Sequence, residues 1–83
     1  MCYFVYILQS HVDGSFYVGY SNDVDRRLAE HNAGLSSYTS RKMPWEIFHI
    51  EKYDLKSDAI KRERFLKRQR NREFFLRLKQ SAG

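Results

Sequence analysis

The chain alternates between continuously apolar stretches and stretches whose apolar positions recur every three or four residues. Residues 3–9 are apolar, aromatic or β-branched almost throughout, which is typical of a strand covered on both faces. The predicted elements are, in order, strands over 3–9 and 15–20, a helix over 23–33, a strand over 45–53, a helix from Ser57 or Asp58 to Lys67 or Arg68, and a helix capped by Asn71. This order, ββαβαα, predicts an α+β fold in which a small three-stranded mixed or antiparallel sheet is flanked by about three helices.

The first two predicted strands are joined by residues with turn chemistry. The segment His11–Gly14 contains Asp and Gly, so the two strands are expected to form an antiparallel hairpin. A loop centred near residues 11 and 12 would place Tyr6 opposite Tyr17, to within about one residue of register.

Cap residues set the limits of the first predicted helix. Residues 21–23 offer side chains that cap a helix N-terminus, and Gly34 is placed to end the helix. Residues 35–44 are polar and loop-like, and Pro44 excludes Met43 from helical geometry.

Length and composition favour one small domain over residues 1–83. The longest apolar run, residues 1–8, is far shorter than the ~20 residues that span a bilayer. A single cysteine, Cys2, excludes an internal disulfide. We therefore expect no membrane association, a reduced cytoplasmic location and no obligate protein partner.

The positive charge is concentrated towards the C-terminus. The chain has 15 Lys and Arg against 10 Asp and Glu, a net charge of +5, and residues 61–79 hold nine of the basic residues with only two acidic ones. Such a local field attracts polyanions such as nucleic acid. The alternative is a solvated basic helix face.

Helical spacing distinguishes two adjacent arginines. At 100° per residue, Val24, Leu28 and His31 share one side of the first predicted helix, with Arg27 at its border. Arg26 points roughly the opposite way, towards solvent. Arg27 and His31 are therefore candidate site residues. Alternatively, Arg27 only lays its aliphatic stem along the surface and His31 is a hydrogen-bonded border residue.

One acidic residue interrupts an apolar stripe. Ala59, Ile60 and Leu66 share a side of the second predicted helix, and Glu63 falls in the middle of this side. A buried carboxylate must be paired, protonated or bound to a cation. Glu63 is therefore either the partner of a nearby arginine or a ligand of Mg²⁺, which often takes only one or two protein carboxylates.

Two tyrosines and a glycine complete the candidate chemistry. Tyr6 and Tyr17 are predicted to be cross-strand neighbours, an arrangement that also serves packing alone. Gly19 lies where no side chain would block an approach to the backbone. Two phenols, an arginine, a histidine and a carboxylate are the groups that phosphodiester cleavage needs for proton transfer, phosphate binding and metal binding.

These residues resemble the GIY-YIG nuclease family. The triplets Phe4-Val5-Tyr6 and Tyr17-Val18-Gly19 are spaced like its two signature triplets, residues 17–34 are similar to its second strand and first helix, and the stretch from Ala59 to Lys67 resembles the helix with its metal-binding glutamate. The resemblance covers almost the whole chain. It implies a stand-alone minimal nuclease domain.

The resemblance also implies a metal-dependent endonuclease that cuts DNA, with repair or recombination as its setting. Glu63 would hold a single Mg²⁺ or Mn²⁺, Arg27 would steady the scissile phosphate, and His31 would be an acid–base or phosphate contact. Tyr6 and Tyr17 would line the attack site, one of them orienting or deprotonating the water. An ordinary phenol is a weak base at neutral pH, so either a nearby cation lowers its pKa or His31 takes the proton. The expected nucleic-acid contacts are Arg27, Lys61, Arg62, Arg64, Lys67, Arg68 and Arg70.

The sequence departs from the family pattern at Phe4, where the family name implies glycine, and this side chain would fill space at the edge of the site. A polar residue that often follows the family's glutamate helix has two possible equivalents here, Gln69 and Asn71. In the loop before the third predicted strand, Tyr38 and Thr39 could touch the substrate.

Two other functions remain open on sequence grounds. A non-catalytic nucleic-acid binder could retain the fold without turnover. A protein-interaction module could use Phe65, Phe74 and Phe75 as a docking surface. However, Phe65 lies off the Glu63 side of its helix, so we expect it to pack on the third helix instead.

Overall fold

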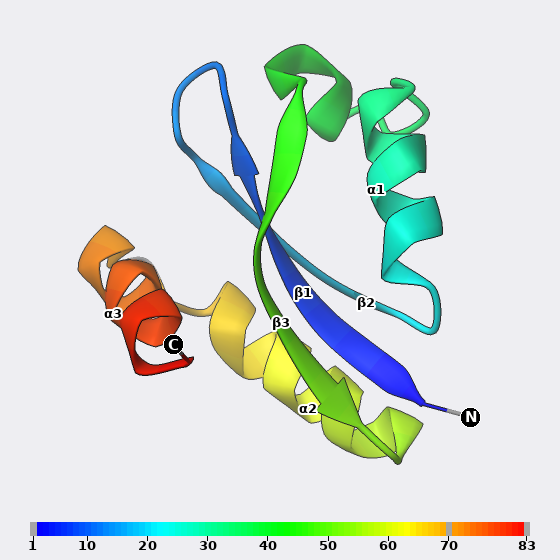
Figure 1. Cartoon of the computed structure of the whole chain (residues 1–83), viewed down its shortest axis with the longest axis vertical. Coiled ribbons are helices and arrows are strands. Elements are labelled where there is room, and N and C mark those ends of the chain that lie inside the picture. The colour runs from blue at the N-terminus through cyan, green and yellow to red at the C-terminus, as the bar shows by residue number, and fades with distance from the viewer. Residues whose placement is uncertain (1, 70, 83) are drawn as a thin grey trace.

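Three antiparallel strands form the middle layer of the protein, shown in the computed structural model in Figure 1. The structure describes residues 2–69 and 71–82. The elements are β1 (Tyr3–Ser10), β2 (Phe16–Ser21), α1 (Val24–Asn32), the 3-10 helix η1 (Thr39–Lys42), β3 (Trp45–Tyr53), α2 (Lys56–Lys67) and α3 (Arg72–Ala82). The predicted α+β fold and the order ββαβαα are confirmed, and the sheet is wholly antiparallel.

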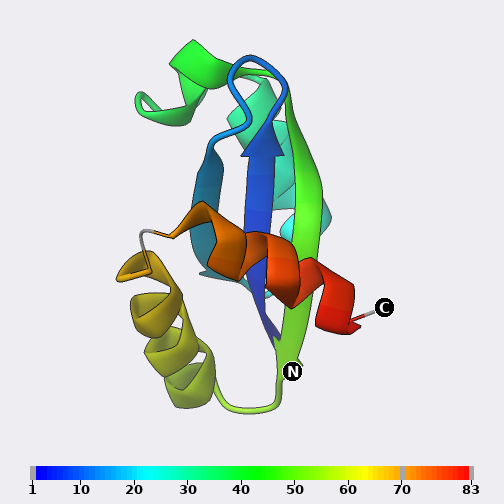
Figure 2. The same cartoon turned by 90° about the vertical axis from the view of Figure 1, so that its left-hand side faces the viewer.

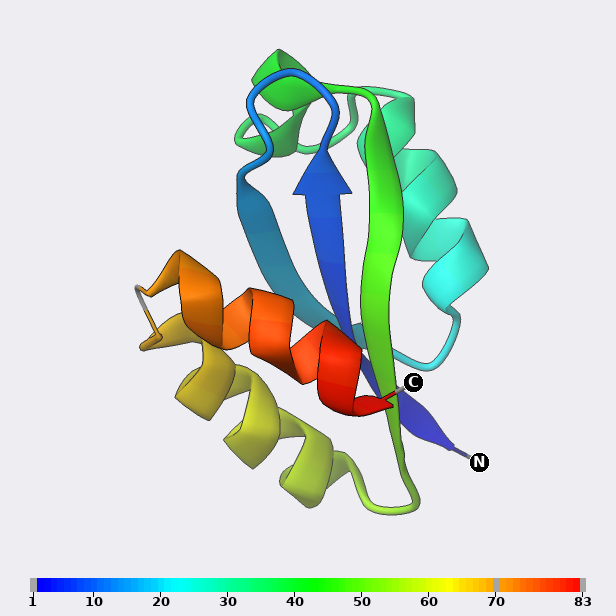
Figure 3. The same cartoon turned by 60° about the vertical axis from the view of Figure 1, so that its left-hand side comes forward.

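The apolar first strand lies in the centre of the sheet. The strand order is β2-β1-β3, so β1 pairs on both sides, as Figure 3 shows. Helix α1 covers one face, and α2 and α3 cover the other, with α3 crossing in front of the strands in Figure 2. The predicted coverage of β1 on both faces is therefore confirmed.

Alternate residues of β1 supply two hydrophobic clusters, one on each face. Val5 and Ile7 pack with residues of α2 and α3, including Leu66. Tyr6 and Leu8 pack on the α1 side. All four β1 side chains are 1% exposed or less, which places Tyr6 deep between the sheet and α1.

The hairpin register differs from the predicted one by two residues. Tyr6 lies opposite Gly19, and Tyr17 lies opposite Leu8. The hairpin closes through a 2.9 Å bond from the Ser10 amide to the Ser15 carbonyl, so its loop is centred one residue later than expected. Because side chains two residues apart share a face, Tyr6 and Tyr17 still lie on the same side of the sheet, as diagonal neighbours.

The limits of α1 follow the predicted caps. The Asp23 carboxylate accepts a 3.1 Å hydrogen bond from the Arg26 amide at the N-terminus. At the other end Gly34 has a φ of +78°, a conformation that costs glycine little.

The predicted cap of α2 is wrong, whereas that of α3 is confirmed. Helix α2 begins at Lys56, after an N-cap residue, Leu55, whose side chain makes no cap bond. Ser57 and Asp58 therefore lie inside the first turn, where a negative charge still favours the helix dipole. Asn71 caps α3, since its side-chain oxygen accepts a 2.9 Å bond from the Glu73 amide.

The segment between α1 and β3 is held firmly although its sequence is polar. The Asn32 side chain pairs with the Trp45 backbone through bonds of 2.7 and 3.0 Å, and the Trp45 indole donates a 2.8 Å bond to the Thr39 carbonyl. Trp45 is 3% exposed, in agreement with its position at the start of β3. None of the helices in the described part of the chain has the length and apolar character that crossing a membrane requires.

Candidate functional site

Tyr6 reaches the edge of the sheet because its cross-strand partner is a glycine. A Cβ atom on Gly19 would lie 2.5 Å from the Tyr6 hydroxyl oxygen and 2.6 Å from the ring carbon that bears it. The phenol therefore occupies the space that a side chain at position 19 would need. Gly19 in the second triplet thus leaves the space that the side chain of Tyr6 in the first triplet occupies.

A directed chain of hydrogen bonds passes through the Tyr6 hydroxyl. The Tyr6 oxygen is 3.3 Å from His31 Nε2, and His31 Nδ1 is 2.8 Å from the Thr39 hydroxyl. The guanidinium of Arg27 donates to Tyr6. A guanidinium can only donate, so the Tyr6 oxygen accepts from Arg27. In the tautomer with the imidazole proton on Nδ1, the Tyr6 hydroxyl would donate to His31 Nε2 and Nδ1 would donate to Thr39.

Burial keeps both Tyr6 and His31 neutral at pH 7. It raises the pKa of Tyr6 above 10, and the opposing hydrogen bond from Arg27 does not outweigh it. Burial also lowers the pKa of His31 below 6.5, and the charge of Arg27 adds to this effect. Arg27 therefore does not bring the pKa of Tyr6 below its ordinary value. The other route considered for a tyrosine base, in which His31 takes the proton, is compatible with the contact between the Tyr6 hydroxyl and His31 Nε2.

Tyr17 is the phenol that lies nearer the surface. Its ring centroid is 4.8 Å from that of His31 and 6.4 Å from that of Tyr6. The partly buried Tyr17 lines a hollow of about 220 Å³ together with Lys67 and Gln69. The buried Tyr6 and the more exposed Tyr17 therefore both lie next to the His31 imidazole.

The two adjacent arginines of α1 differ as predicted. Arg27 is 35% exposed and contacts both Tyr6 and Glu30. Arg26 is 58% exposed, and its guanidinium lies 4.0 Å from Glu30. Arg27 alone of this pair is thus directed to Tyr6.

Glu63 lies at the edge of the buried stripe of α2. Ala59 and Leu66 are fully buried, whereas the Glu63 side chain is 14% exposed. Its ion-pair partner is Lys67, at 3.7 Å, and not one of the arginines considered from sequence. The same Lys67 ammonium lies 6.0 Å from the Tyr17 ring centroid, which places the Glu63 carboxylate near Tyr17.

The donor set suits a hard cation with one protein carboxylate. Within the described residues no three acidic, histidine or cysteine side chains cluster as a metal-binding group. Mg²⁺ keeps most of its water ligands and binds through one or two carboxylates, so Glu63 beside the phenols fits it.

The basic residues of α2 divide between two sides of the helix. Arg62 makes two hydrogen bonds to the Glu51 carboxylate on β3, of 2.8 and 3.1 Å. The Arg62 guanidinium is thus engaged with a carboxylate of the protein, and its role as a nucleic-acid contact stays a prediction. Of the other predicted contacts on this segment, the exposed ones are Lys61, Arg64, Lys67 and Arg68, and Arg70 lies outside the described residues.

Several other residues named from the sequence lie around the site. Thr39 is fully buried against His31, so the expectation that it touches substrate is wrong. The hydrogen bond between Thr39 and His31 joins η1 to α1, so no local sequence pattern could have predicted it. Asn71 is committed to capping α3, whereas Gln69 lies beside Tyr17. Phe4 packs on the Tyr6 side and lines a separate hollow near the start of α1.

The three aromatic residues proposed for docking pack largely on one another. The Phe65 ring lies 6.1 Å from that of Phe74, which lies 5.6 Å from that of Phe75. The expected packing of Phe65 on the third helix is confirmed. Phe75 is 5% exposed and belongs to the core.

Comparisons with known proteins agree with the fold. The chain is similar to the UPF0213 protein lwe0147 of Listeria welshimeri, with 40% identity over 77 residues that cover 89% of this chain and 84% of the relative. The UPF0213 protein VNG_2274C of Halobacterium salinarum is 47% identical over 60 residues, which cover 71% of this chain and 77% of the relative. The solution NMR structure of the UPF0213 protein BH0048 from Bacillus halodurans matches with a TM-score of 0.61 and 32% identity, over 100% of this chain and 88% of that one.

The family comparison covers almost the whole chain. The sequence model of the GIY-YIG catalytic domain matches residues 2–76, a range that includes both phenols, Arg27, His31 and Glu63. This domain is that of a nuclease family whose members generally use a divalent metal and interact with nucleic acid. The chain therefore belongs to the GIY-YIG family.

Proposed function

We propose that this protein is a divalent-metal-dependent endonuclease that hydrolyses phosphodiester bonds in DNA, acting as a single domain over residues 1–83. The observation that carries the proposal is the convergence of five side chains from four elements: Tyr6 of β1, Tyr17 of β2, Arg27 and His31 of α1, and Glu63 of α2. No element alone could supply this set. The membership in a nuclease family supports the same conclusion.

In the proposed mechanism, Arg27 binds the scissile phosphate and offsets the charge that develops on its non-bridging oxygens. Its guanidinium is oriented beforehand by Tyr6 and Glu30 and remains partly exposed. Such orientation before the reaction reduces the reorganisation needed in the transition state.

The phenols and the imidazole handle the proton of the attacking water. Tyr6 can accept a proton from water only as it passes its own proton on, because its pKa is raised. His31 Nε2 lies on that path, and the neutral imidazole is free to accept. Tyr17, which reaches the surface hollow, orients the water and the phosphate.

Glu63 would hold Mg²⁺ or Mn²⁺, which stabilises charge on the leaving oxygen when bound. The exposed cations of α2 (Lys61, Arg64, Lys67 and Arg68) would follow the substrate backbone without reading its sequence. The ion pair between Glu63 and Lys67 supports a second candidate, a nucleic-acid binder without turnover, since a carboxylate neutralised by lysine needs no metal.

The test compares the wild type with Glu63→Gln, which keeps the shape of the side chain and removes its charge. Both are incubated with supercoiled plasmid and with linear, branched and flapped DNA, and with matching RNA, in Mg²⁺ or Mn²⁺. We expect nicking by the wild type and a loss of about 100-fold or more in Glu63→Gln. The matched control is Glu73→Gln, at an exposed carboxylate paired with Arg77, which should retain activity. Circular dichroism checks that each variant is folded.

Full activity of Glu63→Gln would refute the metal role. Salt-sensitive binding by a wild type that cleaves none of these substrates would establish the non-catalytic alternative. Cleavage of the RNA set alone would overturn DNA as the substrate.

A further inference from the structure

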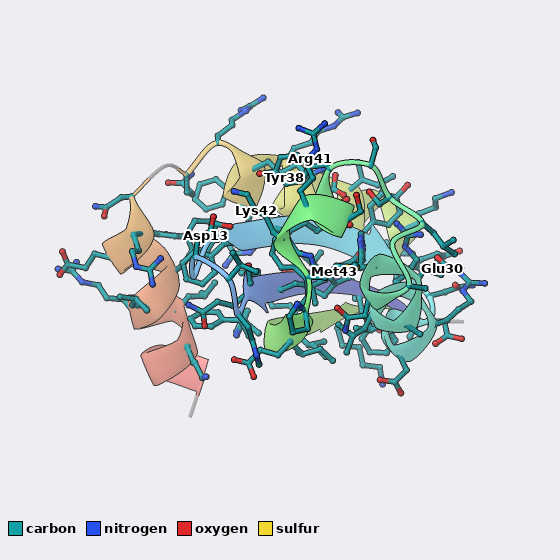
Figure 4. All side chains as sticks on the ribbon, turned by 90° about the horizontal axis from the view of Figure 1, so that it is seen from above. Asp13, Glu30, Tyr38, Arg41, Lys42 and Met43 are labelled. Atoms are coloured by element: carbon teal, nitrogen blue, oxygen red, sulfur yellow. The ribbon has the colours of Figure 1, made fainter. Side chains whose placement is uncertain are left out.

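A second group of aromatic and basic side chains lies on the turn that contains η1. Tyr38, Arg41 and Lys42 line an open hollow of about 420 Å³ together with Ser37. Figure 4 shows these three side chains together on one side of the turn, apart from Met43 and Glu30. The proposed mechanism uses none of them.

The turn is built to hold Tyr38 in solvent. The Ser40 amide donates a 2.9 Å bond to the Ser36 carbonyl, and the Ser40 hydroxyl donates a 3.0 Å bond to the Ser37 carbonyl. The next residue, Thr39, is fully buried against His31. Tyr38 is nevertheless 57% exposed, so a well-anchored backbone presents a large aromatic ring to water.

The exposed ring adjoins the candidate active site. The ring centroids of Tyr38 and Tyr17 are 6.1 Å apart, with 35° between their planes. On its other sides Tyr17 meets His31 and the Lys67 ammonium, which lies 6.0 Å from the ring centroid. A strand bound across Tyr17 would therefore bring its next nucleotide to Tyr38.

Positive charge surrounds the same ring. The Lys42 ammonium lies 5.8 Å from the Tyr38 ring centroid and is held there by Asp13, at 3.2 Å. Arg41 is exposed and makes no ion pair with any residue in the described part of the chain. An aromatic face beside a free guanidinium suits a nucleobase with its phosphate.

We propose that Tyr38 is a stacking platform for an unpaired nucleobase next to the scissile phosphate, and that Arg41 contacts the adjacent phosphate. The inference rests on the proposed function, because it takes Tyr17 as part of the cleavage site. Bases inside a duplex stack on one another and offer no free face, whereas bases of a single strand or flap do. The platform therefore makes single-stranded or flapped nucleic acid the preferred substrate class.

The test measures binding separately from cleavage. The full-length protein is titrated, in EDTA, against a single-stranded oligonucleotide that contains 2-aminopurine and against the matching duplex. The variants are Tyr38→Ala, Tyr38→Phe, Arg41→Ala and, as a control, Leu35→Ala, which truncates an exposed apolar side chain of the same turn. Anisotropy gives the Kd, 2-aminopurine quenching reports stacking, and circular dichroism confirms folding.

We expect Tyr38→Ala to weaken single-strand binding by about 5- to 100-fold and to abolish the quenching. Duplex binding should stay within about twofold, and Tyr38→Phe and Leu35→Ala should bind like the wild type. Arg41→Ala should weaken both complexes and reduce the slope of log K against log salt by about 1.

Unchanged single-strand binding in Tyr38→Ala, equal losses on single strand and duplex, or no binding by the wild type would each overturn the platform. The proposed function is judged separately, by Mg²⁺-dependent cleavage. If the wild type cleaves and Tyr38→Ala binds single strands normally, the proposed function stands and the stacking platform is refuted. If the wild type does not cleave but needs Tyr38 to bind single strands, the platform stands and the proposed function is refuted.

Discussion

Replacing Gly19 with alanine places one methyl group at the glycine with the least space for a side chain among Gly14, Gly19 and Gly34. The new Cβ would lie 2.5 Å from the Tyr6 hydroxyl oxygen and 2.6 Å from the adjacent ring carbon, where ordinary contacts are 3.4–4 Å. The ring or strand β2 would have to move by about 1 Å. Tyr6 is 1% exposed, so the ring has no open space to move into.

This shift has consequences for both stability and catalysis. Overpacking and the weakening of buried hydrogen bonds at Tyr6 should together lower the free energy of unfolding by about 2–4 kcal/mol. A domain of ordinary stability, about 5–15 kcal/mol, would remain folded. Because the Tyr6 hydroxyl joins Arg27 to His31, a displacement of about 1 Å should lower the cleavage rate by about 100-fold.

Urea denaturation and single-turnover cleavage measure the two effects. The control is the same substitution in a Tyr6→Leu background, where the clashing hydroxyl and ring carbon are absent. There, Gly19→Ala should change the free energy of unfolding by less than about 0.5 kcal/mol. Wild-type stability and cleavage rate in Gly19→Ala would refute the steric coupling of positions 6 and 19. So would an equal loss of unfolding free energy from Gly19→Ala in the wild-type and Tyr6→Leu backgrounds.

Two further predictions concern charged residues. Arg27→Ala should lower the cleavage rate by about 100- to 1,000-fold, measured in single turnover. Arg26→Ala, at the more exposed neighbour, should stay within about threefold, and equal losses would contradict the difference between the two. Burial alone would raise the pKa of Glu51, but hydrogen bonds from Arg62 and two neighbours lower it from 4.5 to about 2. The resulting stability is fully present above about pH 4.5 and is lost as the pH falls towards 2, by about 3 kcal/mol. Urea unfolding from pH 7 to 2.5 should show this decline, and Glu51→Gln should flatten it; an unchanged profile in that variant would exclude Glu51 as its source.

Much of the fold follows from local sequence. A strand that is apolar or aromatic from residue 3 to residue 8 has to be covered on both faces and so lies in the centre of the sheet. Gly34 and Asn71 mark helix ends because their conformational freedom and side-chain chemistry act over a few residues. The α2 start shows the limit, since Ser57 can cap but the helix begins without a side-chain cap.

The helical period also predicts part of the site. It separates Arg27 from Arg26 and places Glu63 on the partly buried side of its helix, because both depend on directions within one element. Arg62 shows where this reasoning ends. Its charge suggests a substrate contact, but its partner, Glu51, lies on another element.

The sequence by itself determined the three strands, the three α-helices and the sides of α1 and α2 that face the interior. Tertiary structure alone decided the hairpin register, the position of Tyr6 over Gly19, the support of His31 by Thr39 and the pairing of Arg62 with Glu51. The physical reason is the range of the forces: propensity and periodicity act within a few residues, whereas steric exclusion and hydrogen-bond pairing depend on atoms that only the complete fold brings together.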